Sequence, residues 1–247
     1  MTDREPDEGR RGLRSPAWII SAVLIIAVLI VGGAAILWPR GDTPPEEPTT
    51  PPTATQTAET TDPADPAASI CGLEPGDQSV PTEPPAEAEW TLHGTFAAPS
   101  VEGVGPGQVD PDGLNRCFAR SPTGALLAAI NYWAMIAADP TVVGDARLLV
   151  DNAAAEQLRA QVESGQVSEF SGLQLAAYSI RGVPEPSDSL VVVDLVFAQV
   201  GSDSLVLAPM PMVWETGDWQ FELPATGDTG FQTIPSTNGY VVWSGTS

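Results

Sequence analysis

The sequence contains no lysine, a single histidine and only two cysteines. Its ten basic residues are all arginines, and 32 acidic residues outnumber them, so the formal net charge is −22. Because nucleic-acid binding needs clustered positive charge against the phosphates, this imbalance argues against DNA or RNA as a direct partner. One histidine, His93, and no Cys-x-x-Cys pair also make a metal site unexpected, and no cofactor is expected.

Charge is missing altogether from one long apolar segment near the N-terminus. WIISAVLIIAVLIVGGAAILW, residues 18–38, carries a tryptophan at each end, where aromatic rings prefer the level of the lipid headgroups. As a helix it would extend roughly 31 Å, about the thickness of the hydrocarbon core. The alternative is a cleaved signal peptide, whose apolar region usually has only about 7 to 15 residues. The pattern predicts one transmembrane helix.

The distribution of arginine predicts how this helix is oriented. Four arginines precede the apolar segment, and only Arg40 follows it closely. Positive charge favours the cytoplasmic side, so residues 1–17 are predicted to be a cytoplasmic tail. The protein is therefore expected in the cell membrane as a single-pass protein, with its C-terminal part outside the cell.

Residues 39–70 are dominated by proline, threonine, alanine and acidic residues. With so little apolar surface to bury, such a segment cannot offset the entropy lost on ordering. We expect a disordered linker that separates the membrane from a folded domain at 71–247.

The two cysteines, Cys71 and Cys117, both fall in the predicted extracellular domain. A compartment outside the membrane permits disulfides, and an even count suits one bridge. Closing this interval would stabilise the fold by about 4 kcal/mol in the loop-entropy model. Two free buried thiols remain the alternative.

Helical patterns occupy the first half of this domain. Ser121 followed by Pro122 is typical of a helix start, with serine as the N-cap and proline in the first turn. The helix is predicted to run to Ala138. A second helical stretch is predicted over 144–164, with a break near 151–152.

Strand patterns dominate the second half, after a first short strand predicted at 90–96. The predicted strands are 173–181, 190–200, 205–214, 219–223 and 240–243. In 219–223, Trp219, Phe221 and Leu223 alternate with polar residues. Pro209 and Pro211 predict an edge or a bulge in their strand. Helices followed by antiparallel strands predict an α+β domain with the helices on one face of the sheet.

The sequence contains few candidate catalytic residues, and the first is Ser121. Ser121 would need a base, but the only histidine lies in a predicted strand, and RSPTG is not the Gly-x-Ser-x-Gly elbow of hydrolases. The helix cap explains Ser121 without further assumptions. No catalytic residue is assigned.

Asp194 is the remaining polar candidate, in the middle of an apolar strand. If it were buried, its pKa could rise and it could act as an acid or base. Val193 and Leu195 on either side of it already define an inward face, so we expect the Asp194 side chain to face solvent.

Three segments resemble a known family: CFARSPTGALLAA, WETGDWQFELP and the closing GYVVW. They are similar to an actinobacterial family of membrane-anchored proteins encoded with integrative conjugative elements, over residues 71–245. The order of helices and strands is similar to the nuclear-transport-factor-2-like cone, a bent antiparallel sheet with helices packed on it. That fold serves in scaffold subunits of type IV secretion channels and in the Gram-positive conjugation protein TcpC.

The resemblance implies a non-catalytic scaffold or assembly subunit of a conjugative transfer or secretion apparatus. It further implies protein partners in a cell-envelope complex and a possible homo-oligomer. A second hypothesis is an extracellular module that binds or senses a small ligand. A third is a cone-fold enzyme using Asp194, Tyr132 or Tyr178.

Overall fold

The computed structural model describes residues 69–167, 172–182, 189–226 and 229–245. The predicted cytoplasmic tail, the predicted transmembrane helix and nearly all of the predicted linker lie outside these ranges. Within the described ranges, no helix is both long enough and apolar enough to cross a membrane.

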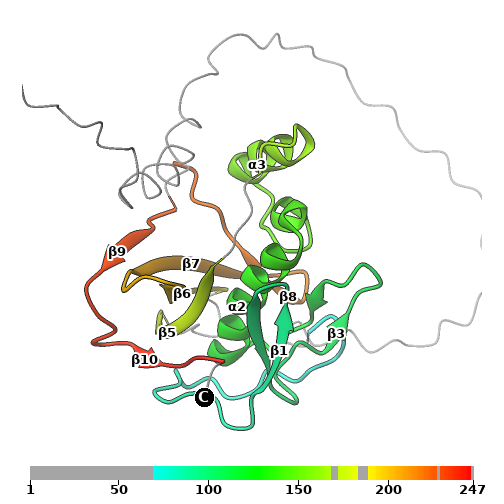
Figure 1. The fold of residues 1–247 in the computed structure, drawn as a ribbon. Coiled ribbons are helices and arrows are strands. Elements are labelled where there is room, and N and C mark those ends of the chain that lie inside the picture. The colour runs from blue at the N-terminus through cyan, green and yellow to red at the C-terminus, as the bar shows by residue number, and fades with distance from the viewer. Residues whose placement is uncertain (1–68, 168–171, 183–188, 227–228, 246–247) are drawn as a thin grey trace, which may run out of the picture.

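The centre of the fold is an antiparallel sheet of six strands, and the predicted α+β class is confirmed (Figure 1). Neighbouring strands follow the order β10-β5-β6-β7-β8. On the side of β7 away from β6, β8 pairs with the C-terminal end of β7 and β9 pairs with its N-terminal end. The strands are β5 (Leu173–Arg181), β6 (Leu190–Gln199), β7 (Leu205–Glu215), β8 (Asp218–Phe221), β9 (Gln232–Ile234) and β10 (Val241–Val242).

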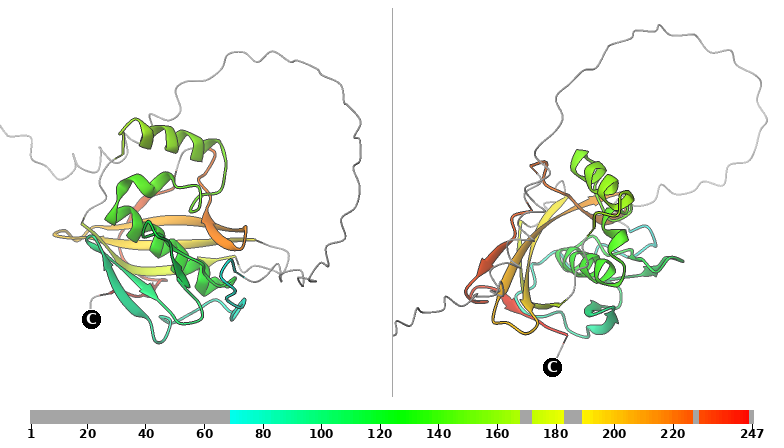
Figure 2. Two further views of the ribbon diagram at one scale, coloured as in Figure 1. Left: turned by 90° about the vertical axis from the view of Figure 1, so that its right-hand side faces the viewer. Right: turned by 45° about the horizontal axis from the view of Figure 1, so that its top comes forward.

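Helix α2 (Pro122–Ala138) lies against one face of this sheet, and it is apolar on all sides. Figure 2 shows the helix on the opposite side of the sheet from β9 and β10. A helix of this kind must be covered all round. Strands β6, β7 and β8 cover one side, and the hairpin of β1 (Glu89–His93) and β2 (Phe96–Ser100) covers another.

The predicted single strand at 90–96 is wrong, because the chain reverses inside it. Gly94 adopts φ +58°, and Gly94–Thr95 form a two-residue turn between the paired residues His93 and Phe96. Glycine in the first turn position is typical of a type II′ hairpin. The apolar residues on both sides of Gly94 predict one continuous strand, whereas the glycine allows the chain to turn there.

The second predicted helix is also shorter than expected. A 3₁₀ turn, η2 (Pro140–Gly144), follows α2, and the α-helix α3 covers only Ala153–Glu163, with Asn152 as its N-cap. Between them the backbone of 148–150 pairs with β8: Phe221 N–H donates to the Leu148 carbonyl, and Val150 N–H to the Phe221 carbonyl. These bonds remove the segment from the helix.

All four residues of β8 are buried, so the predicted alternation of buried and exposed positions is wrong there. The amide of Gln220 lies 3.5 Å from the Arg147 carbonyl, beneath the segment that precedes α3. The prolines fit the prediction of an edge more closely. On the side of β7 away from β6, β9 pairs with 205–207 and β8 with 212–215, so Pro209 and Pro211 fall between the two partners.

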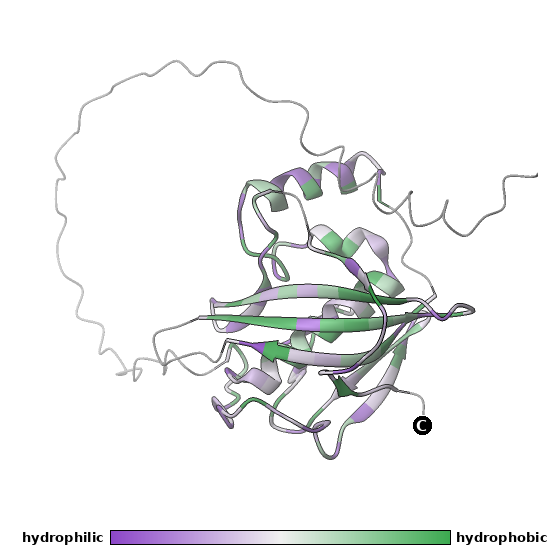
Figure 3. Ribbon diagram, turned by 90° about the vertical axis from the view of Figure 1, so that its left-hand side faces the viewer, coloured by the Kyte–Doolittle hydropathy of each residue, from purple (hydrophilic) through white to green (hydrophobic). Residues whose placement is uncertain are grey.

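The chain closes the fold by crossing the outer face of the sheet, the face away from α2. It passes from β9, beside β7, to β10, beside β5, and Figure 3 looks onto this crossing. Ile234 and Tyr240 on the crossing segment pack against a small second core of Ala177, Val196 and Leu207.

The tightest approach in the β1–β2 hairpin suggests a stability test. A Cβ on Gly94 would lie 2.5 Å from the Ala137 carbonyl oxygen at the end of α2, whereas one on Gly113 would meet nothing within 4 Å. Both glycines have positive φ. We expect Gly113→Ala to lower the free energy of unfolding by about 1 kcal/mol from backbone strain, and Gly94→Ala by about 2–4 kcal/mol because the clash adds to it.

The measurement is denaturant unfolding of the two variants beside wild type. Equal losses in the two variants would show that the hairpin and the end of α2 do not pack as described.

Candidate functional site

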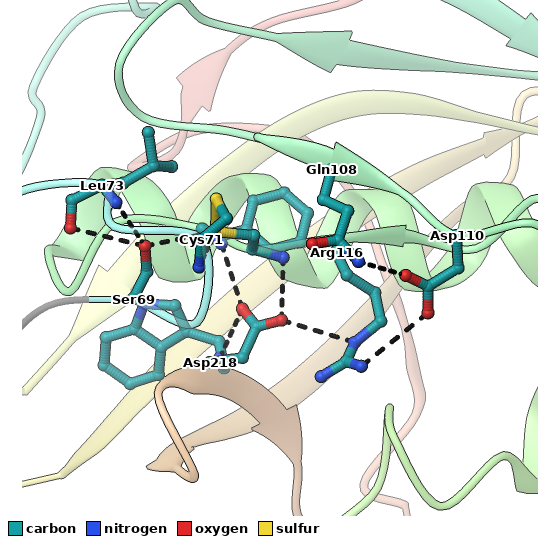
Figure 4. The surroundings of a disulfide bond; sticks show 10 residues. Ser69, Cys71, Leu73, Gln108, Asp110, Arg116 and Asp218 are labelled. Atoms are coloured by element: carbon teal, nitrogen blue, oxygen red, sulfur yellow. Dashed lines mark hydrogen bonds and ion pairs between the residues drawn. A yellow bond between two sulfur atoms is a disulfide. The ribbon is translucent and has the colours of Figure 1, made fainter.

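The best-defined polar site lies where the described chain begins. A disulfide joins Cys71 to Cys117, with 6.0 Å between their Cα atoms, and the described residues contain no free cysteine. Figure 4 shows its surroundings. The bridge ties the segment that follows the predicted linker to the residues just before α2.

Hydrogen bonds reinforce this entry segment on both sides of the bridge. Ser69 Oγ accepts from Leu73 N–H at 2.7 Å and lies 3.2 Å from the Cys117 sulfur. Ile70 N–H donates to the Gly217 carbonyl at 2.8 Å, in the turn between β7 and β8. The segment is therefore held to two parts of the domain that are distant in sequence.

Asp218 is the polar centre of the site and is 2% exposed. Its carboxylate accepts hydrogen bonds from the backbone N–H groups of Cys117 (2.8 Å), Phe118 (3.0 Å) and Trp219 (3.0 Å). Burial raises the pKa of Asp218, while these three bonds and the nearby Arg116 act in the opposite direction. Cys117 has φ +68°, and the bond to Asp218 together with the disulfide holds it in that uncommon conformation.

An aspartate–arginine network continues from Asp218 toward the surface. Arg116 lies 3.6 Å from Asp218 and 3.8 Å from Asp110, and Asp110 also pairs with Arg147 at 2.9 Å. Arg147 in turn binds Asp112 and Asp145. Its hydrogen bonds lower the pKa of both these carboxyl groups, and the same hydrogen bonds raise the pKa of Arg147. The outer part of the network is solvent-exposed, so it adds less to stability than the buried part.

Ser121 is the N-cap of α2. It is 1% exposed, and its hydroxyl accepts from the N–H of Gly124 at 3.0 Å, with Pro122 opening the first turn. The His93 ring contacts the Asn115 side-chain amide at 3.4 Å, and not the Ser121 hydroxyl. Burial lowers the pKa of His93.

Asp194 lies on the outer face of the sheet as predicted, but the prediction of a solvent-facing side chain is wrong. It is 5% exposed, because Arg181 covers it with a bidentate pair at 2.6 Å from each oxygen. Ser179 Oγ lies a further 3.4 Å away. A side chain from the neighbouring strand thus neutralises the carboxylate and shields it from water.

The three candidates for a cone-fold enzyme do not converge. Tyr132 and Tyr178 belong to the core between the sheet and α2, whereas Asp194 lies on the opposite face. Each tyrosine hydroxyl donates to a backbone carbonyl: Tyr132 to Val143 at 3.1 Å and Tyr178 to Glu83 at 2.8 Å. Burial raises the pKa of Tyr132, and raises that of Tyr178 to about 12.

One open cleft of about 270 Å³ is present among the described residues. It lies between the β1–β2 hairpin and β5, near the C-terminus. Its lining residues are Trp90, Thr91, Leu92, Thr95, Ala97, Gln174, Leu175 and Gly245. This lining contains no ionisable group, so it supports contact with an apolar or uncharged group and offers no acid–base chemistry. The described residues contain no group of acidic, histidine or cysteine side chains placed to hold a metal ion.

Sequence reasoning identified the two cysteines and the helix cap but missed Asp218 and the arginines paired around it. Asp218 falls between the predicted strands 205–214 and 219–223, and nothing in its local sequence marks it as a buried group. It lies 101 residues from Cys117 in the chain, and no local pattern marks an aspartate that binds the backbone of so distant a segment.

The buried carboxylate gives a direct test of this site. Asp218→Asn places an amide NH₂ or a single carbonyl where three N–H groups need an acceptor. We expect the free energy of unfolding to fall by about 2–4 kcal/mol, since buried donors lose a charged acceptor. Asp203→Asn is the matched control, because Asp203 is exposed in the turn between β6 and β7. Thermal unfolding of the full-length chain in detergent measures both; an unchanged midpoint in Asp218→Asn would contradict the assigned bonds.

Comparison with known proteins gives a family and no closer relative. No curated protein and no solved structure matches the chain significantly. A family model described as "Domain of unknown function (DUF8175)" matches residues 50–242, which is most of the chain and includes nearly the whole described domain. The chain belongs to the DUF8175 family.

Proposed function

We propose that this protein is a single-pass, membrane-anchored and non-catalytic scaffold or assembly subunit of a conjugative transfer or secretion apparatus. Residues 18–38 would cross the cell membrane, residues 39–70 would form a disordered spacer, and the domain at 71–247 would act outside the cell. Its partners would be other proteins of the cell envelope, including further copies of itself.

The observation that carries this proposal is the attachment of the entry segment. Residues 69–73, which follow the predicted spacer, are joined to the start of α2 by the disulfide and to the β7–β8 turn by Ile70. A domain that holds partners while tethered to a membrane needs its tether fixed to the core, so that strain on the tether does not unravel the first strand. A disulfide also suits the oxidising side of a membrane.

The polar groups named as catalytic candidates support the same conclusion. Ser121 is occupied as a helix cap, Asp194 is paired with Arg181, and both tyrosine hydroxyls bind carbonyls. Each has a structural partner, and none of them lines the cleft beside β1. The resemblance of the sequence to conjugation scaffolds supplies the specific assignment.

The cleft beside β1 favours a second candidate, an extracellular module that binds a small ligand. Its volume of about 270 Å³ lies just below the range of typical ligand pockets, roughly 300–1,000 Å³. Its lining suits an uncharged group, but the cleft is open and few polar groups converge in it.

Crosslinking in living cells tests the scaffold proposal. The full-length tagged chain would be crosslinked in cells that express the transfer system, and copurifying proteins would be identified by mass spectrometry. We expect a DNA-translocating ATPase and polytopic channel subunits. The Asp218→Asn chain is the control: it should reach the membrane but recover fewer neighbours, because its domain is destabilised. Recovery of the chain alone would overturn the proposal.

A further inference from the structure

Strand β1 has one partner, and its other edge is open. β2 pairs with it along its whole length, from Glu89 opposite Ser100 to His93 opposite Phe96, without a bulge. Among the described residues, no backbone hydrogen bond reaches the opposite edge of β1.

The hydrogen bonds around β2 show which groups of β1 point outward. The carbonyl of Pro99 accepts from the Asn131 side chain on α2 at 3.1 Å, so it points away from β1. Pro99 lies opposite Trp90, and in an antiparallel pair both members of such a position point away from each other. The N–H and C=O groups of Trp90, and by the two-residue period those of Leu92, therefore face the open edge.

This edge lacks the features that usually prevent strands from pairing. Natural edge strands carry charged residues, especially lysine, or proline, contain a bulge, or are very short. The one acidic residue of β1 is Glu89, at its first position. β1 has five residues, EWTLH, with no lysine, proline or bulge, whereas β3 (Gln108–Val109), β4 (Asn115–Arg116) and β10 have two residues each. The Leu92 side chain is also 70% exposed, the largest exposed fraction of any large apolar side chain among the described residues.

The sequence of β1 complements itself when it is read in the opposite direction. An antiparallel pair centred on Thr91 places Glu89 opposite His93 of a second copy, and Trp90 opposite its Leu92. Acidic and imidazole side chains thus meet at both ends of the pair, and like-charged Glu89 side chains stay apart. In the same register Trp90 and Leu92 exchange four backbone hydrogen bonds in total, since their polar groups face the open edge.

We propose that β1 is a self-association surface, at which two copies of this chain pair their β1 strands antiparallel about Thr91. Leu92 of each copy would then lie beside Trp90 of the other, at the cleft that Trp90 and Leu92 line together. The pairing joins two two-stranded hairpins into one four-stranded ribbon, in the order β2-β1 of one copy and β1-β2 of the second copy. The overall charge of −22 opposes association, but tethering in a shared membrane would raise the effective concentration.

This surface specifies where the further copies named in the proposed function would bind, but it does not depend on a transfer apparatus. Self-association could exist in a ligand-binding module as well as in a scaffold. A test on the chain alone, without other envelope proteins, therefore separates the two proposals.

Engineered cysteines in the full-length chain, in membranes, test the register. Thr91 is exposed, and the two native cysteines are already bridged, so Thr91→Cys adds the one reactive thiol among the described residues. In the proposed pair the two 91 positions face each other about 4.5 Å apart, within disulfide range. We expect mild oxidation to convert most of this variant to a covalent dimer.

Two matched variants distinguish the register from random collision. In the proposed pair the two 89 positions are four residues apart along the strands, about 14 Å, so Glu89→Cys should remain monomeric. Thr141→Cys, exposed in η2 on another part of the domain, should also remain monomeric. No dimer from Thr91→Cys, or equal dimer from all three variants, would overturn the proposal.

Blocking the open edge gives an independent measurement. Leu92→Pro removes an outward N–H that does not bond to β2, and Leu92→Asp adds a charge at an exposed position. Both changes, made in the Thr91→Cys chain, should reduce the dimer at least five-fold. Retention of the Cys71–Cys117 bridge and an unchanged thermal midpoint in Leu92→Asp would show that the fold is intact. Undiminished dimer in both variants would contradict pairing through β1.

Discussion

Helix α2 is apolar on all sides and must be buried all round, and the arrangement of the domain follows from that constraint. A single sheet can cover only one side of a helix, so the rest of the surface must be supplied by other segments. The β1–β2 hairpin, the segment from η2 to α3 and the disulfide-linked entry segment each provide part of this cover. None of these pieces has a large core of its own, and each is therefore held by specific polar bonds as well as by apolar contacts.

Those polar bonds explain where charge is buried in so acidic a protein. Asp218 satisfies three N–H groups of segments that would otherwise end unpaired at the start of α2 and β8. Asn131 performs a similar role on the helix itself, accepting from Asn115 and donating to the Pro99 carbonyl. In both cases a polar side chain supplies the bonds that regular secondary structure cannot supply at a junction.

Much of the fold could be predicted from the sequence because many of its elements are determined by residues that are close together in the chain. The cap at Ser121, the end of α2 near Asp139–Pro140 and the long strands β5 to β7 each depend on neighbouring residues. Apart from the local turn at Gly94–Thr95, the errors occur where tertiary contacts override the local pattern. Residues 148–150 look helical but pair with β8, Gln220 looks solvent-facing but lies under that segment, and Asp194 on the outer face is covered by Arg181. The network around Asp218 could not be predicted, since its members are close only after folding.

The C-terminal segment crosses the outer face of the sheet, and its contacts become possible only after the rest of the domain has been synthesised. Trp243, almost the last described residue, packs its ring against Trp90 at 5.0 Å and Tyr178 at 5.7 Å, and so joins the first strand to the main sheet. During synthesis these two rings emerge from the ribosome long before their shared neighbour. The contacts of Trp243 with these two rings therefore form only after translation has passed residue 243, and they complete the packing of the hairpin against the sheet.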